Sequence, residues 1–593
     1  MREQLINLRK RMKEENIDIY LILSDDYHSS EYVGDYFKCR EYVSGFTGSA
    51  GSVVVTRDEA GLWTDGRYFI QAAKELEGSG ITLYKMGEEG VPKVSEYIMD
   101  NLKEGETLGF DGKSVPATLY EKLLNGAKGI IRTDVDLVGD IWENRPSFPK
   151  GRIYSLSDKY TGMNFSCKIG KVRDKMAEKG ADFFVLSSLD DIAWLYNIRG
   201  EDIAYNPVAM AYSIIGKSSI SLYLCVDSMD EDCKNILQNG GVTLKDYNEA
   251  YVDAKMLNGK ILVDKRNTSA ALLSILKKNG EPVYSENPTI QLKAVKTPVE
   301  MENVRKAHLE DGIALTKLIY WLKHEPLSDK LTELSVADKL EGFRKERAGY
   351  LYQSFAPIIA SGEHGAIVHY DPDEKTNIPI RNDTFVLMDT GGQYLTGTTD
   401  VTRTVSIGNV SPKMKKYYTA VLKGHLMLGN AKFKYGTTGQ NLDYIARKPL
   451  WDIGLDYNHG TGHGVGYLLN VHEGPQSIRM KAPEGSTPAS FEEGMITSNE
   501  PGVYIEGEFG IRTENLVMCL FDYVNEFGRF MKFETLTLVP YDRASIETED
   551  LSEEEIKILN EYNRRVYEAL SPYLSEEERT WLKGETDEIQ SWN

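Results

Sequence analysis

Cysteine and long apolar segments are both scarce in this chain of 593 residues. The five cysteines are scattered and include no Cys-x-x-Cys pair, which argues against a disulfide framework and for a reducing compartment. No apolar run approaches the ~20 residues that span a bilayer. The N-terminal segment Met1–Met12 is a charged amphipathic helix start and lacks the apolar core of a secretory signal. These absences predict a cytoplasmic protein with no membrane partner.

Positive charge is in deficit as well. Lysine and arginine number 69 against 90 aspartates and glutamates, and the formal net charge is −21. A surface of this sign disfavours nucleic-acid backbone and anionic membrane as partners. With 41% hydrophobic and 27% charged residues, the composition is otherwise that of an ordinary globular protein, and the length allows about three or four domains.

Several common catalytic signatures are also missing. The chain contains no His-Glu-x-x-His, which excludes a zincin. The glycine-rich segment Gly460–Gly466 is not followed by Gly-Lys-Ser/Thr, which excludes a phosphate-binding loop, and no clear βαβ pattern of a dinucleotide site surrounds it. His463 stands at its centre, and the glycines are better explained as letting the backbone bring this histidine close to a metal.

What the chain does contain is a set of four carboxylates and one histidine in the pattern of a two-metal site. The five residues are Asp389, Asp400, His463, Glu500 and Glu514. Asp389 is predicted at the end of one β-strand and Asp400 early in the next, with a glycine-rich turn between them. Glu500 and Glu514 are expected on two further strand-like segments separated by a turn.

The charges of these five residues match two divalent cations. Four ionised carboxylates balance the four positive charges of two such ions, and a neutral histidine adds none, which leaves room for one bridging hydroxide. Without metal the carboxylates would repel one another, and some would bind protons. Oxygen-rich ligation favours hard ions such as Mn²⁺. Two metals roughly 3.5–4 Å apart are a recognised hydrolytic device.

The wording of the motifs resembles the pita-bread metallopeptidases, and among them the three-domain Xaa-Pro aminopeptidases, also called aminopeptidase P. The motifs are Met388-Asp-Thr-Gly391, Thr399-Asp-Val-Thr-Arg403, His459-Gly-Thr-Gly-His-Gly-Val-Gly466, Ser498-Asn-Glu-Pro-Gly502 and Arg512-Thr-Glu-Asn515. All five positions that the family uses as metal ligands hold ligand residues here. The resemblance implies that a metal-bridging hydroxide hydrolyses the bond between an N-terminal residue and a following proline.

The resemblance also implies the cofactors and partners. Two divalent ions are expected, Mn²⁺ first, with Zn²⁺ or Co²⁺ as alternatives. The substrates would be small peptides with proline at position 2, and the protein would be a homodimer.

Roles for residues around the expected metals follow from the same resemblance. His369, His459 and His472 fall where the family places substrate-binding or proton-transferring histidines. His369 and His472 are candidates to stabilise the carbonyl oxyanion, and His459 to hold the proline side. Glu500 would relay the proton of the nucleophilic water in addition to binding metal.

Three other residues near the motifs have weaker assignments. Arg512 lies two residues before Glu514 and is a candidate to orient the ligands, with a purely structural ion pair as the alternative. Phe355 is a candidate wall of the substrate pocket, against the simpler interpretation as a core residue. His364 matches no role in the family.

The first half of the chain reads as two copies of one α/β unit. Residues 5–24 form a helix followed by a strand, and residues 171–186 repeat this pattern. A proline-rich loop, residues 144–151, joins the copies. Thr297-Pro-Val-Glu300 carries the signature of a helix N-terminus, and Val304, Ala307, Ala314, Leu318 and Leu322 follow at helical spacing.

The expected fold class is therefore α/β (α+β), with three domains. By resemblance these are two creatinase-like N-terminal α/β domains, residues 1–150 and 151–296, followed by a pita-bread catalytic domain with C-terminal helices, residues 297–593.

Other interpretations remain beside the aminopeptidase. A prolidase would cleave Xaa-Pro dipeptides only, but the chain length and the two N-terminal domains favour the aminopeptidase. Methionine aminopeptidases lack this N-terminal pair, and creatinase shares the fold without the metals. A non-enzymatic pita-bread binding module, as in histone-chaperone relatives, suits the acidic charge, but such a module should have lost ligands and here none is missing.

Overall fold

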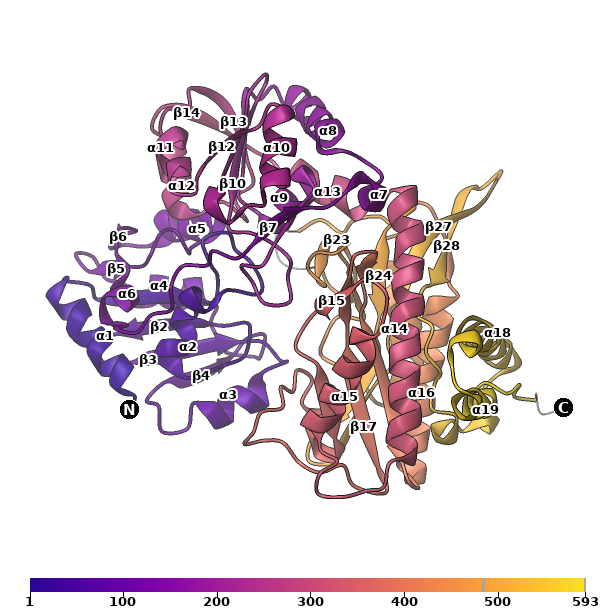
Figure 1. Cartoon of the computed structure of the whole chain (residues 1–593). Helices are drawn as coiled ribbons and strands as arrows, with labels where there is room; N and C mark the ends of the chain where they lie inside the picture. Colours follow the sequence, from indigo (N-terminus) through magenta and orange to yellow (C-terminus); the bar gives the residue numbers. More distant parts are fainter. Residues whose placement is uncertain (483–485, 591–593) are drawn as a thin grey trace. The chain divides into compact units, whose positions relative to one another are not determined.

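The computed structural model describes residues 1–482 and 486–590 and confirms the mixed α/β class (Figure 1). The chain divides into two compact units. One contains residues 1–158 and 163–289, and the other contains residues 159–162 and 290–593. No helix in the described part of the chain is both long enough and apolar enough to cross a membrane.

The first unit contains two six-stranded sheets of the same design. The first sheet has the order β4-β3-β2-β1-β5-β6 and the second the order β12-β11-β10-β8-β13-β14. Their strands are β1 (Ile19–Leu23), β2 (Ser52–Thr56), β3 (Ala60–Thr64), β4 (Thr82–Lys85), β5 (Thr107–Gly109) and β6 (Ile130–Arg132), then β8 (Phe183–Leu186), β10 (Tyr212–Gly216), β11 (Ile220–Leu224), β12 (Thr243–Asp246), β13 (Gly259–Val263) and β14 (Gly280–Tyr284). In each sheet the central strand, β1 or β8, pairs antiparallel on one side and parallel on the other.

Helices accompany both sheets of the first unit. They are α1 (Glu3–Glu14), α2 (Cys39–Ser44), α3 (Phe69–Glu75), α4 (Val94–Asn101), α5 (Ala117–Gly126) and α6 (Leu137–Ile141) in the first copy, and α8 (Phe165–Glu178), α9 (Leu189–Tyr196), α10 (Glu231–Asn239), α11 (Glu249–Ala254) and α12 (Ala270–Leu276) in the second. Helix α13 (Pro288–Ala294) follows.

The predicted repeat is visible in the register of buried residues. The helix before each central strand buries apolar side chains at positions i, i+3 and i+7: Leu5, Leu8 and Met12 in α1, and Ile169, Val172 and Met176 in α8. The offset between the two copies is 164 residues for these positions (169 − 5) and for the strand starts (183 − 19). The domain limits themselves remain a prediction.

The second unit begins with the long helix α14 (Pro298–His324). Thr297 caps it, and Glu300 completes a capping box, as the sequence predicts. The apolar positions expected on its inner face are all buried. The other helices of the unit are α15 (Glu333–Lys345), α16 (Pro412–Gly429), α17 (Gly439–Trp451), α18 (Glu553–Leu570) and α19 (Glu576–Glu585). Ser552 and Ser575 cap the last two, also as predicted.

Strands of the second unit build several small sheets and one of six strands. The orders are β16-β17-β20, β15-β18-β19, β25-β26 and β21-β28-β27-β24-β22-β23. The bounds are β15 (Tyr350–Gln353), β16 (Ile358–Ser361), β17 (Thr384–Thr390), β18 (Gly392–Tyr394), β19 (Gly397–Thr398), β20 (Val401–Ile407), β21 (Lys432–Lys434), β22 (Gly462–Gly464), β23 (Glu473–Ile478), β24 (Ile496–Asn499), β25 (Gly502–Ile505), β26 (Phe509–Arg512), β27 (Asn515–Asn525) and β28 (Gly528–Thr535). Helices α14 and α15 stand beside these strands (Figure 1).

Three acidic residues lie just outside the strands on which they were expected. Asp400 directly precedes β20, which begins at Val401, and Glu500 and Glu514 lie at one end of the β24–β27 pair. Strands β24 and β27 are antiparallel, and their register pairs Asn499 with Asn515. Glu500 follows the first of these residues and Glu514 precedes the second, so both acids leave the same end of the ladder together. Their backbone N–H groups bond outside this pair of strands: that of Glu500 donates to the carbonyl oxygen of Thr461 at 2.8 Å, and that of Glu514 to the carbonyl oxygen of Thr402 at 3.1 Å.

Candidate metal centre

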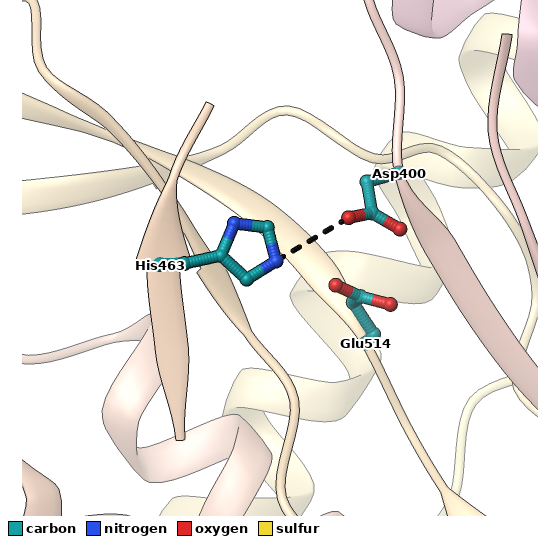
Figure 2. Close-up of side chains that lie close together, drawn as sticks. All are labelled: Asp400, His463 and Glu514. Carbon is teal, nitrogen blue, oxygen red and sulfur yellow. Dashed lines mark ion pairs between the residues drawn. The ribbon is translucent and has the colours of Figure 1, made fainter. Parts of the chain in front are cut away.

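Asp400, His463 and Glu514 converge from three separate elements. Each offers one ligand atom, and these atoms lie within 4.8 Å of one another (Figure 2). His463 Nε2 is 3.5 Å from Asp400 Oδ2 and 3.4 Å from Glu500 Oε1. The other ring nitrogen, Nδ1, is 2.9 Å from the carbonyl oxygen of Gly464, so it carries the proton. When the ring is neutral, this tautomer directs the Nε2 lone pair at the carboxylates, as a metal ligand requires.

Hydroxyl groups orient two of the carboxylates. Thr402 Oγ1 donates to Glu514 Oε2 at 2.7 Å, and Ser498 Oγ donates to Glu500 Oε1 at 2.9 Å. Ser498 Oγ also accepts the backbone N–H of His463 at 2.9 Å. The same serine therefore ties together two residues of the predicted ligand set.

Asp389 keeps one oxygen available. It lies near the end of β17, opposite Thr402 of β20. Its Oδ2 accepts a 2.6 Å hydrogen bond from Arg512 Nη2. Its Oδ1 is buried and has no hydrogen-bond partner within residues 1–482 and 486–590. A buried carboxylate oxygen is costly to leave without a donor or a cation, so this atom marks a place for one.

The carboxylates are too close together to be ionised without a counter-charge. Burial, the largest cause, and the nearby charge of Asp400 raise the pKa of Asp389 to about 6, against the pull of Arg512. Burial and the charges of Asp400 and Glu500 raise the pKa of Glu514 well above its ordinary value. A cation placed among these groups relieves the same repulsion. Four carboxylates and one imidazole therefore fit hard divalent ions.

His463 and Glu500 both shift toward their charged forms, because each lies beside groups of opposite charge. Burial alone would lower the pKa of His463, but the hydrogen bond to Asp400 and the charges of Glu500 and Asp400 raise it to about 9. Burial alone would raise the pKa of Glu500, but the charges of His463 and Arg512 and the hydrogen bond from Ser498 outweigh it, and the pKa falls below its ordinary value. In the metal-free protein a proton on His463 supplies part of the missing positive charge.

A hydrogen-bonded chain leads from Asp389 to His459. Arg512 Nη1 donates to the hydroxyl oxygen of Tyr504 at 2.7 Å, and this hydroxyl is 2.9 Å from His459 Nε2. His459 Nδ1 is 2.8 Å from the carbonyl oxygen of Gly460, so Nε2 accepts the Tyr504 proton. Burial lowers the pKa of His459 to about 4, which keeps the ring neutral. Both of its ring nitrogens are engaged.

The other predicted site residues lie around this core. The ring of His472 packs edge-on against His463, with 4.3 Å between the ring centroids and an angle of 81°. Phe355 is half-buried beside the turn between Asp389 and Asp400, where a Cβ on Gly391 would come within 2.9 Å of its ring. His369 lies on the segment after the short helix η3 (Gly362–Ala366) and is half-buried.

A buried ion pair holds the turn between Asp389 and Asp400. Arg344 Nε donates to Asp311 Oδ1 at 2.7 Å, and Arg344 Nη1 donates to the carbonyl oxygen of Gly391 at 3.0 Å. Thr399 Oγ1 donates to Asp311 Oδ2 at 2.9 Å. The pair thus holds the turn at Gly391, two residues after Asp389, and at Thr399, directly before Asp400.

A second pair holds the segment that carries two of the histidines. Arg447 Nε donates to Asp443 Oδ2 at 2.7 Å, and Arg447 Nη2 donates to the carbonyl oxygen of His459 at 3.0 Å. Thr461 Oγ1 donates to Asp443 Oδ1 at 2.5 Å.

A third group, next to His472, is a carboxylate between two lysines. Glu473 Oε2 accepts from Lys293 Nζ at 2.9 Å, and Glu473 Oε1 accepts from Lys296 Nζ at 2.5 Å. The Glu473 and Lys296 side chains are each 1% exposed. The positive charge of the two lysines outweighs the effect of burial, which by itself would raise the pKa of Glu473, and the pKa falls below its ordinary value.

Sequence reasoning missed Tyr504, Asp311, Arg344, Asp443, Arg447 and Glu473. Each lies in an ordinary helix or strand pattern, and its partners are mostly distant in sequence. The i,i+4 spacing of Asp443 and Arg447 on one helix is a local signal that could have been found, whereas the other contacts form only once the chain has folded.

Comparison with known proteins places family models along nearly the whole chain. Residues 302–519 match the model of metallopeptidase family M24, and residues 529–589 match the C-terminal region of peptidase M24. Residues 4–145 and 144–300 each match a creatinase/prolidase N-terminal domain.

Curated relatives match over nearly their full length. The chain is 38% identical to Xaa-Pro aminopeptidase 1 of Dictyostelium discoideum, covering 98% of this chain and 95% of the relative. It is 38% identical to a probable Xaa-Pro aminopeptidase P of Coprinopsis cinerea, covering 99% and 98%.

Solved structures give the same picture. X-prolyl aminopeptidase of Caenorhabditis elegans, described as a cytosolic enzyme with a di-nuclear active site, has a TM-score of 0.93 and 34% identity, with 99% of both chains covered. The Xaa-Pro dipeptidase of Bacillus anthracis, at a TM-score of 0.51 and 24% identity, covers 64% of this chain and 99% of its own, and shares the fold.

Proposed function

Because the chain belongs to metallopeptidase family M24, and within it to the Xaa-Pro aminopeptidases, we propose that it hydrolyses the bond between an N-terminal residue and a following proline. The observation that carries the proposal is the convergence of Asp400, His463 and Glu514, with Glu500 against the same imidazole. The full-length match to aminopeptidases, with two creatinase-like N-terminal domains, favours this activity over that of a prolidase.

The metal ligands in this proposal are Asp389, Asp400, His463, Glu500 and Glu514. Two divalent cations held by these residues would polarise the peptide carbonyl and lower the pKa of a water molecule. The di-nuclear site of the C. elegans enzyme supports the number of ions. The oxygen-rich donor set supports Mn²⁺, with Zn²⁺ or Co²⁺ as alternatives.

Residues of the chain handle protons and orientation. Glu500, whose pKa lies below its ordinary value, is ionised and able to accept a proton from water. Arg512 holds Asp389, and Tyr504 joins Arg512 to His459. Since both ring nitrogens of His459 are engaged, we assign it to packing against the proline side of the substrate.

Two histidines and one aromatic residue complete the assignment. His369 and His472 would donate to the carbonyl oxygen as negative charge develops there. Phe355, beside the Gly391 turn, would line the pocket.

Other features of the proposal concern the whole protein. We place it in the cytoplasm, as the C. elegans relative is described as cytosolic, and as a homodimer by family resemblance. We retain the domain limits 1–150, 151–296 and 297–593. The matched stretches ending at 145 and 300 support these limits.

The test is hydrolysis of Arg-Pro-Pro and of Gly-Pro by metal-stripped protein, with and without added Mn²⁺. Metal-dependent release of free arginine, with poor cleavage of Gly-Pro, is the expected result. A preference for Gly-Pro would identify a prolidase. Failure to cleave either peptide with any divalent metal would leave the non-enzymatic binding module.

A further inference from the structure

The segment that carries His369, residues 361–378, makes several hydrogen bonds to one buried carboxylate. This is Glu333, the first residue of α15, whose side chain is fully buried. Its Oε1 accepts the backbone N–H of Ser361 at 2.8 Å and lies 2.9 Å from Nδ1 of His364. Its Oε2 accepts the hydroxyl of Tyr370 at 2.9 Å and the N–H of Ile378 at 3.3 Å.

These partners span the segment from its start to its end. A buried carboxylate needs donors to offset the loss of water, and Glu333 takes all of them from residues 361–378. His364, to which the sequence assigns no role, is one of these donors. The backbone of α15 adds a second connection, because the N–H of Glu333 donates to the carbonyl oxygen of Ile378 at 3.2 Å.

The held segment packs against the strand that ends in Arg512. A Cβ added to Gly510 would lie 1.7 Å from the carbonyl oxygen of Gly365, so η3 and β26 touch backbone to backbone. Tyr370, 5% exposed, belongs to an apolar cluster with Leu387, and Tyr504 packs against the same cluster. Leu387 lies two residues before Asp389. Tyr370, the neighbour of His369, is thus packed against residues that flank the candidate metal centre.

We propose that Glu333 is a positioning residue, which holds His369 beside the metal centre through its bonds to His364 and Tyr370. The proposal rests on the oxyanion role assigned to His369 above. Glu333 acts through another residue, so its loss should change the rate of the chemical step more than the binding of substrate.

The experiment uses the full-length Mn²⁺-loaded enzyme and two variants that weaken the bonds between Glu333 and the segment 361–378. Glu333→Gln keeps the size of the side chain and removes its charge. Tyr370→Phe removes a single hydroxyl and keeps the ring in its cluster. The matched control is Glu341→Gln, on the same helix, where the carboxylate also accepts a tyrosine hydroxyl, that of Tyr350 at 2.5 Å, and loses its charge in the same way.

Two measurements follow for each protein. Steady-state hydrolysis of Arg-Pro-Pro is measured alone and in the His369→Ala background, and amide hydrogen exchange is measured for residues 362–378. We expect Glu333→Gln to lower kcat about tenfold with KM changed by less than about threefold, and to speed exchange in this segment. Tyr370→Phe should do the same to a smaller extent, and Glu341→Gln should do neither.

The double variant decides between positioning and general damage. If Glu333 acts through His369, Glu333→Gln costs less than about twofold once His369 is alanine, because the two losses are not additive. Equal losses in both backgrounds, or unchanged exchange in residues 362–378, would overturn the proposal. A wild-type kcat for His369→Ala alone would instead remove the assigned role of His369, and the inference with it, while faster exchange would still show that Glu333 holds the segment.

Discussion

The second unit buries acidic side chains of two kinds, which differ in the source of their counter-charge. Glu473 lies between two lysines, and its pKa falls below the ordinary value. Glu514 lies among other carboxylates with the Thr402 hydroxyl as a donor, and its pKa rises well above the ordinary value. The first kind is electrostatically complete within the protein, whereas the second needs a cation from outside.

Because of this difference, replacing a buried carboxylate by its neutral amide should change the stability of the metal-free protein in opposite directions at the two kinds of position. Neutralising a carboxylate of the first kind leaves buried positive charge without a partner, which destabilises the fold. Neutralising one of the second kind relieves repulsion in the metal-free protein and removes a metal ligand. The following substitutions test whether the division holds.

Glu514→Gln should have the largest effect on activity. Loss of a ligand that also balances metal charge is expected to lower kcat/KM by about 10³-fold or more, or about 4 kcal/mol of transition-state stabilisation. The metal-free variant should nevertheless unfold at the same temperature as the wild type or higher. Metal content by mass spectrometry, kinetics and thermal unfolding after chelation check this. A metal-free variant clearly less stable than wild type would contradict the division.

Glu473→Gln should be the reverse case. It leaves two buried ammonium groups with a neutral amide between them, and we expect a loss of about 3–5 kcal/mol in the free energy of unfolding. Urea denaturation of the metal-free proteins measures it, with Glu514→Gln as the matched control. Similar free energies of unfolding for the two variants would show that the fold does not depend on the ion pairs of Glu473 with Lys293 and Lys296.

Tyr504→Phe tests a carboxylate that falls between the two kinds. Asp389 belongs to the candidate metal centre, but it also has a protein counter-charge, Arg512, which bonds to Tyr504. The variant removes the hydroxyl between Arg512 and His459 and keeps the ring in place. We expect kcat/KM to fall about 10–100-fold, as for other groups that orient ligands. Kinetics with the same Mn²⁺ occupancy in both proteins check this, and an unchanged kcat/KM would show that the chain from Arg512 to His459 does not matter for catalysis.

The pH dependence of stability should show the smallest effect. The pKa of Glu473 is below the ordinary 4.5, so its contribution is present above pH 4.5 and is lost as the pH falls through the lowered value. The stability difference between wild type and Glu473→Gln should therefore narrow by about 1.4 kcal/mol per pH unit in that window. Urea denaturation from pH 6 to about pH 3 follows it. A constant difference would rule out titration of Glu473.

Individual residues show which features of the structure could be predicted from the sequence. Thr297 and Glu300 predict the start of α14 correctly, because the residues of a capping box are only three positions apart in the sequence. The α/β class and the membership of the family were predicted from motif wording and are confirmed. Asp400, His463 and Glu514 offer ligand atoms within 4.8 Å of one another, with Glu500 against the same imidazole. The assignment of these four and Asp389 as the ligands of a two-metal site remains a prediction.

Other parts of the centre were beyond reach for a physical reason. Glu333 and Tyr370 are 37 residues apart, and Asp389 and Arg512 are 123 apart, and no helical or strand period connects such positions. Glu500 and Glu514 were expected on strands because their neighbours are strand-forming residues. The structure shows that the ladder stops one residue short of each.

The contact between Gly365 and Gly510 has a consequence for how this protein can vary. Each glycine is already the smallest residue, so a larger residue at one position cannot be accommodated by a smaller one at the other. The two sites should behave as an uncompensable pair in a saturation library, with inactive variants at both positions although neither offers a side chain to metal or substrate.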